Sequence, residues 1–160
     1  MGLASAVRRL AEFLVRPHGP ARSFAQEVEG AGITGRADAG MATIPTRKVV
    51  GSVGRAHNLR SDFFYRTGRA MTARFVGIGK AMEQGKVLPP IEVYKARLRR
   101  RRGEVEAPVT EYYVVDGHHR VAMAKRLGQD FLDAHVVEYR VAPAPSPGPV
   151  DGEGRAADPT

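Results

Sequence analysis

The chain has no cysteine among its 160 residues. This absence excludes disulfide bonds, thiolate zinc sites and cysteine nucleophiles. The sequence also lacks an apolar run approaching the roughly 18 to 20 residues that cross a membrane as a helix, and its N-terminus lacks the charged stub and apolar block of a secretory signal. We therefore expect a cytoplasmic protein without membrane partners, of a length that suits one domain with its own core.

Acidic residues are scarce in the middle of the chain. Residues 41–102 contain fifteen Lys and Arg against three Asp and Glu, a net charge of +12, whereas the whole chain carries +8. Such a basic segment favours partners that carry phosphate, either nucleotides or nucleic acid. The alternative is that arginine is the common surface residue of a GC-rich genome, and composition leaves both open.

Hydrophobic periodicity predicts a small mixed α/β domain, of the α+β kind, over residues 41–141. Strands are predicted at 43–49, 88–96, 111–115 and 134–139, and helices at 70–84 and 118–127. The order of these elements indicates a mixed sheet with helices packed against it. The run 99–103 is predicted to turn the chain between the second and third strands, and residues 51–54 to form a loop.

The sequence on either side of this domain is less regular. Residues 3–14 repeat apolar side chains at helical spacing, and a second short helix is predicted over 23–28. Residues 30–40 are small and Gly-rich, which is typical of a flexible linker. The last residues are rich in Pro, Gly, Ala and acid, which predicts disorder. The expected organisation is an N-terminal helix and linker over 1–40, the domain over 41–141 and a tail over 142–160.

The stretch that carries chemistry is a strand followed by Asp116 and Gly117 and then a helix that starts with His118, His119 and Arg120. The first N–H groups of a helix lack internal partners and lie at the positive end of its dipole, so they bind anions. A carboxylate at the end of a strand commonly holds Mg²⁺ or orients a hydroxyl group. The alternative is that Asp116 only caps the helix and that the histidines behind it are exposed.

Residues 111–128, which read EYYVVDGHHRVAMAKRLG, resemble the signature of the ParB/sulfiredoxin-like superfamily. Residues 78–93 are similar to that family's helix, glycine and Pro-Ile-Val strand, and residues 44–55 to its opening strand and loop. The resemblance covers about residues 43–139. It implies a domain like the N-terminal domain of ParB, with a nucleotide such as ATP, ADP or CTP bound together with Mg²⁺.

The residues at positions 116–120 distinguish the branches of that superfamily. Sulfiredoxins carry their catalytic cysteine where this chain has His118, so sulfiredoxin activity is excluded. Chromosome-partitioning ParB proteins carry Gly-Glu-Arg-Arg here, of which Gly117 and Arg120 remain. The free-serine kinase branch carries Asp-Gly-His, a small residue or His, and Arg, which matches residues 116–120 directly.

That closest branch implies specific roles for the loop. Gly117, His118, His119 and Arg120 would hold the nucleotide phosphates, and Asp116 would lie near Mg²⁺ and the hydroxyl acceptor. Asp116 and His118 are then the candidate catalytic residues. Members of that branch also use a Glu in the loop after the first strand as a general base.

The corresponding loop of this chain contains no Glu. His57 and Asp62 are the side chains in it that can accept a proton, so they are the candidate bases. Arg55, in the same loop, is predicted to reach across to the phosphates.

The favoured prediction is therefore a Mg²⁺-dependent phosphotransferase or nucleotide hydrolase that acts on a small hydroxyl compound or water. The alternative is a non-enzymatic module that binds a nucleotide as a switch, or binds nucleic acid through an arginine hairpin. The residues of that hairpin are Arg99, Arg100, Arg101 and Arg102.

Overall fold

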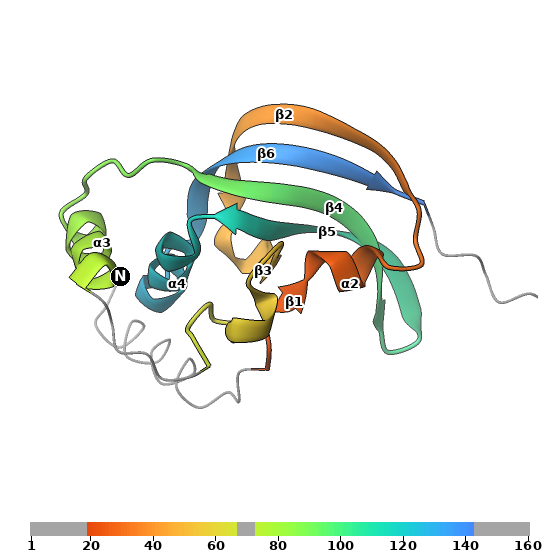
Figure 1. The fold of residues 1–160 in the computed structure, drawn as a ribbon, viewed down its shortest axis with the longest axis horizontal. Coiled ribbons are helices and arrows are strands. Elements are labelled where there is room, and N and C mark those ends of the chain that lie inside the picture. The colour runs from red at the N-terminus through yellow and green to blue at the C-terminus, as the bar shows by residue number, and fades with distance from the viewer. Residues whose placement is uncertain (1–18, 67–72, 143–160) are drawn as a thin grey trace, which may run out of the picture.

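The structure, a computed structural model, describes residues 19–66 and 73–142. These residues form one six-stranded mixed sheet with helices packed against it, which confirms the predicted small α+β fold (Figure 1). The strands are β1 (Arg22–Ser23), β2 (Ile33–Pro45), β3 (Val49–Ser52), β4 (Ile91–Arg102), β5 (Val105–Asp116) and β6 (Phe131–Val141). The helices are α2 (Phe24–Val28), α3 (Ala73–Glu83) and α4 (His118–Leu127), with single 3-10 turns η1 (Thr46–Lys48) and η2 (Ala56–Asn58).

The strand order is β1-β3-β5-β4-β6-β2. β1, β3 and β5 run parallel to one another, β4 runs parallel to β6, and the pairs β4/β5 and β2/β6 are antiparallel. Because β3 and β5 are parallel neighbours, their carboxyl ends meet at one edge of the sheet. The loop after Ser52 and the start of α4 are therefore brought side by side from positions some sixty residues apart.

The core lies on both faces of the sheet, because adjacent strand residues point to opposite sides. Val114 belongs to the cluster on the α4 face, whereas Tyr113 belongs to a second cluster with Phe24 of α2. The Phe24 ring packs edge-on against Tyr94, Tyr113 and Tyr139 at 5.2–5.4 Å between ring centroids. Residues before position 41 are thus part of the core.

The helical predictions within the described residues are confirmed. Residues 118–127 form α4 as predicted, and the chain leaves it through Gly128 in the left-handed conformation, with φ 68°. α3 occupies Ala73–Glu83 inside the predicted range, and Phe75, Ile78 and Met82 pack on the core. The helix predicted over 3–14, the residue Met71 and the tail after Ala142 lie outside the described residues.

The predicted flexible linker over residues 30–40 is wrong. Residues Ile33–Pro45 form β2, which pairs antiparallel with β6 from Ile33↔Val141 to Pro45↔Phe131. The predicted edge strand at 43–49 is likewise divided, since β2 ends at Pro45 and β3 begins at Val49. The small residues of this segment lack the apolar alternation of a buried strand, and pairing with β6 is what makes them extended.

The predicted turn at 99–103 and loop at 51–54 are also displaced. β4 continues through Arg102, and the hairpin turns at Gly103, whose φ is 61°. Gly51 and Ser52 belong to β3, where a Cβ on Gly51 would lie 2.2 Å from the carbonyl oxygen of Arg22. Close contact between β1 and β3 therefore requires glycine at that position.

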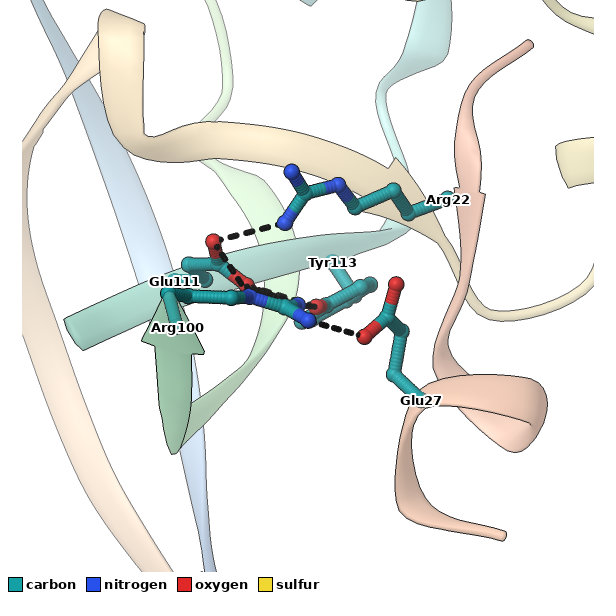
Figure 2. A network of polar contacts seen from close by, with 5 residues as sticks. All are labelled: Arg22, Glu27, Arg100, Glu111 and Tyr113. Atoms are coloured by element: carbon teal, nitrogen blue, oxygen red, sulfur yellow. Dashed lines mark hydrogen bonds and ion pairs between the residues drawn. The ribbon is translucent and has the colours of Figure 1, made fainter. Parts of the chain in front are cut away.

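A network of charged side chains fixes α2 and β1 to the β4/β5 hairpin (Figure 2). Arg100 lies 2.5 Å from both Glu27 and Glu111, and Arg22 donates to the second oxygen of Glu111 at 2.8 Å. The Tyr113 hydroxyl donates to Glu111 at 2.9 Å and is itself fully buried. Arg100, predicted to lie in the turn at 99–103, is instead the centre of this network.

No helix in residues 19–66 and 73–142 is long and apolar enough to cross a membrane.

Candidate functional site

Gly117 joins β5 to α4 in a conformation that favours glycine. Its φ is 104°, in the region that residues with a Cβ rarely adopt, and a Cβ here would lie 2.5 Å from a methyl carbon of Ile91. The first helical bond runs from the Val121 N–H to the Gly117 carbonyl at 3.1 Å. Gly117 thus lets the backbone turn directly from the strand into the helix.

The first turn of α4 has no side-chain cap from the described part of the chain. The N-cap residue is Gly117, so the alternative in which Asp116 caps the helix is wrong. Asp116 instead accepts a hydrogen bond from Arg120 at 3.0 Å. The leading N–H groups of a ten-residue helix therefore keep the capacity to bind an anion.

His118 is buried and makes a hydrogen bond with Ser52. The Ser52 hydroxyl lies 2.8 Å from Nε2 of His118, and the same hydroxyl accepts the Arg55 backbone N–H at 3.0 Å. Burial, and then the positive charge of Arg55, lower the pKa of His118 to about 4. His118 is thus a neutral imidazole at pH 7, with Nε2 directed to Ser52 rather than to the opening of the site.

His119 lies between two aromatic rings. The centroids of Tyr65 and Phe75 are each 6.0 Å from that of His119. Burial lowers the pKa of His119, as do the nearby charges of Arg74 and Arg55.

Arg55 and Arg74 supply the positive charge around the start of α4. Arg55 is close enough to affect the pKa of both histidines, and its guanidinium donates to the Tyr65 hydroxyl at 3.4 Å. Both arginines are exposed. The structure therefore brings Arg55 to the predicted site and adds Arg74, which sequence analysis missed.

Arg120, predicted to hold the nucleotide phosphates, contacts three groups of the chain itself. Its guanidinium donates to the carbonyl oxygens of Pro89 and of Pro90, the latter at 2.8 Å, and to Asp116. Only 15% of its side chain is exposed, whereas Asp116 is 73% exposed. Arg120 thus holds the loop before β4 against α4 and orients the Asp116 carboxylate.

A pocket of about 300 Å³ lies beside Arg120. Met82, Leu88 and Leu132 give it an apolar part, while Arg120 and Asp133 contribute charge. A pocket of this size and mixed character accommodates a small polar molecule.

Asp116 is the candidate metal ligand of the site. Within residues 19–66 and 73–142, no three His, Asp or Glu side chains are grouped so as to hold a metal ion. Mg²⁺ is often held by one or two carboxylates together with phosphate oxygens and water. The exposed carboxylate of Asp116 fits a Mg²⁺ that arrives with a nucleotide.

The two candidate bases lie in different environments. His57 is exposed on η2, immediately after Arg55 and Ala56. Asp62 is buried, forms an ion pair with Arg60 at 2.5 Å and accepts the Phe64 N–H at 3.2 Å. His57 is therefore the candidate that solvent and a ligand can reach.

Ser52 is not among the predicted site residues, because residues 51–54 are predicted to form a loop, whereas Ser52 ends β3. The contact between Ser52 and His118 depends on the parallel pairing of β3 with β5, and no local pattern signals that pairing.

The arginine hairpin is only partly available to a ligand. Arg100 lies in the network described above, and Arg99 pairs with Glu106 at 3.3 Å across the hairpin. Arg101 and Arg102 are exposed.

Comparisons with protein-family models, with curated proteins and with solved structures find no match to this chain.

Proposed function

We propose that this chain is a cytoplasmic nucleotide-binding domain of the ParB/sulfiredoxin-like fold, whose phosphate site is the first turn of α4. The observation that carries the proposal is the start of α4 at the left-handed Gly117, which has no side-chain cap among the described residues, with Arg55 close to both histidines and Arg74 close to His119. Backbone N–H groups and guanidinium groups are the donors that phosphates bind most strongly in proteins.

The charges at the site favour an anion over a cation. Arg55 and Arg74 place two positive charges near His119, and Arg55 lies near His118 as well. Asp116 and its register partner Glu92 contribute carboxylates at this edge, and the ion pair of Asp116 with Arg120 offsets the charge of Asp116. Phosphate oxygens would relieve the repulsion among the arginines.

The catalytic form of the proposal is transfer of a phosphoryl group to a small hydroxyl compound or to water. Mg²⁺ bound with the nucleotide would neutralise charge on the phosphates. Asp116 would hold that ion or orient the acceptor hydroxyl, and the pocket beside Arg120 would receive the acceptor. His57 does not line that pocket, and it is the candidate that would take a proton from a hydroxyl or water bound on the Arg55 side of the phosphates.

Isothermal titration with ATP, ADP, CTP and GTP, each with Mg²⁺, tests the binding site. One of the four is expected to bind, and Arg55→Gln is expected to weaken that binding about tenfold by removing a charged donor. Arg97→Gln, which changes an exposed arginine of β4, is the matched control and is expected to bind like the unchanged protein. If the two variants bind the nucleotide with equal affinity, the result would contradict a phosphate site beside Arg55.

Phosphate release or transfer from the nucleotide that binds tests catalysis separately. Asp116→Asn is expected to abolish turnover while leaving binding without Mg²⁺ unchanged. Binding without turnover in the unchanged protein would leave a nucleotide switch as the function.

Nucleic acid is the second candidate partner, and the exposed Arg101 and Arg102 favour it. This alternative is tested if no nucleotide binds. It would be supported by binding of single- or double-stranded nucleic acid with an affinity that falls steeply with salt. The double substitution Arg101→Ala and Arg102→Ala should then abolish that binding.

A further inference from the structure

One edge of the sheet is long, and no other described strand pairs with it. β2 spans thirteen residues and, within the described chain, pairs only with β6, whereas the opposite edge is the two-residue β1. An edge strand leaves a row of backbone N–H and C=O groups available for another strand. In Figure 1, β2 forms the outer border of the sheet, on the far side of β6 from β4.

The side chains of β2 protect this edge poorly. Between Ile33 and Pro45 there is one Arg and one Asp and no Lys, although Lys is the residue that most often guards edges. Two large apolar side chains are exposed on the strand, Ile33 at 50% and Met41 at 60%. Both features favour contact with another protein surface over solvent.

The pairing of β2 with β6 shows which of its side chains share a face. Four residues of β2 lie opposite alternate residues of β6: Ile33 faces Val141, Arg36 faces Tyr139, Asp38 faces Val137 and Met41 faces His135. These four side chains therefore point to one side of the sheet, despite the register shifts before Gly35 and before Gly40. Gly35, Ala37 and Gly40 point to the other side and are small.

This face is self-complementary about Ala37. The position of each β2 residue can be counted by the β6 residue that it faces. On this count Arg36 and Asp38 lie one position to either side of Ala37, and Ile33 and Met41 lie three positions to either side. In an antiparallel pair related by a two-fold axis, a residue n steps before the centre faces the residue n steps after it. Opposite charges would therefore face each other, and so would the two exposed apolar side chains.

We propose that two copies of this chain form a dimer through antiparallel pairing of their β2 edges, with the two-fold axis at Ala37. In this pairing Arg36 faces Asp38 of the second copy, and Ile33 faces Met41 of the second copy. The two sheets join into one continuous sheet. The proposal does not depend on the nucleotide site, which lies at the ends of β3 and β5.

Asp38 keeps the capacity for this contact. Its Oδ1 accepts the Gly40 N–H and lies 2.8 Å from Nε2 of His135. Both contacts use Oδ1, and the side chain is 67% exposed. The second carboxylate oxygen can therefore accept from Arg36 of the second copy.

The absence of cysteine allows a direct test by cross-linking. Ala37→Cys places the two introduced thiols opposite each other at the axis, within the distance of a disulfide. Oxidation is expected to give a covalent dimer on a non-reducing gel. Ala42→Cys, at another exposed alanine of the same strand, is the control, because its two thiols would be about 30 Å apart.

Charge exchange tests the register. Arg36→Asp and Asp38→Arg each place like charges opposite each other, so each is expected to weaken the dimer about tenfold in sedimentation equilibrium. The two variants mixed together, and the double exchange in one chain, restore opposite charges and are expected to restore the dimer.

If the unchanged chain is monomeric at every protein concentration tested by sedimentation equilibrium, the proposal is overturned. A dimer that cross-links at residue 42 as readily as at residue 37, or one that is insensitive to every charge exchange, would also overturn it.

Discussion

Ser52 and His118 form the contact that joins the two loops of the site. The Ser52 hydroxyl accepts the Arg55 N–H at 3.0 Å and lies 2.8 Å from Nε2 of His118. The same hydroxyl is 3.4 Å from the Val114 carbonyl, to which it can donate. These contacts hold the backbone at Arg55 beside the start of α4.

Ser52→Ala is expected to reduce the free energy of unfolding by about 1–3 kcal/mol. The substitution leaves the buried Nε2 of His118 without its partner, and an unsatisfied buried polar group costs that amount. Urea denaturation measures the loss. Ser61→Ala, at an exposed position, is the matched control, and equal stabilities of the two variants would contradict the role of Ser52.

At the scale of elements, the charged network attaches α2 to the sheet. α2 has only five residues and Ser23 at its N-cap makes no side-chain cap bond, so its own hydrogen bonds stabilise it little. The aromatic contacts of Phe24 and the ion pair between Glu27 and Arg100 hold it in place instead. Burial by itself would raise the pKa of Glu111, but hydrogen bonds from Arg100 and Tyr113 hold it below its usual value.

Glu111→Gln is expected to reduce the free energy of unfolding by about 2–3 kcal/mol. The side chain of Glu111 is 7% exposed, and its neutralisation leaves the poorly solvated Arg100 with Glu27 as its remaining charged partner in the network. Glu106→Gln is the matched control. Glu106 and Arg99 are each 55% exposed, so breaking that pair is expected to change stability by less than about 0.5 kcal/mol. A similar effect of both substitutions would argue against the network.

Sequence periodicity identified the elements that bury one face and missed those that do not. α3 and α4 have apolar side chains at helical spacing, and their positions followed from that pattern. β2 has small, mostly exposed residues, and the arginine run of β4 has charged ones, so neither has the alternation of a half-buried strand. Both are extended because they pair with β6 and β5.

At the scale of the whole molecule, protonation of the buried histidine opposes folding. The pKa of His118 is about 4 in the folded chain and about 6.5 in the unfolded chain. Between these values the unfolded chain binds the proton and the folded chain does not, so stability rises with pH across this interval. His119, whose pKa is also lowered, acts in the same direction.

The free energy of unfolding is expected to increase by about 3 kcal/mol between pH 4 and pH 6.5 from His118 alone. Chemical denaturation at a series of pH values measures this slope. His118→Gln is expected to reduce the slope even if it lowers stability at pH 7, whereas His57→Gln, at an exposed position, is expected to leave it unchanged. The same slope in both variants would show that His118 is not the group that titrates.

The sequence by itself determined the α+β class, the positions of α3 and α4, and the Asp-Gly-His-His-Arg loop at the start of a helix. These properties are local, because helical spacing, a glycine that ends a helix and a strand-to-helix turn are set by neighbouring residues. The tertiary structure alone decided that Ser52 contacts His118, that Arg100 is held by Glu27 and Glu111, and that residues 33–45 form an edge strand. Each of these depends on which strands lie next to each other, and that is decided by packing between segments far apart in the chain.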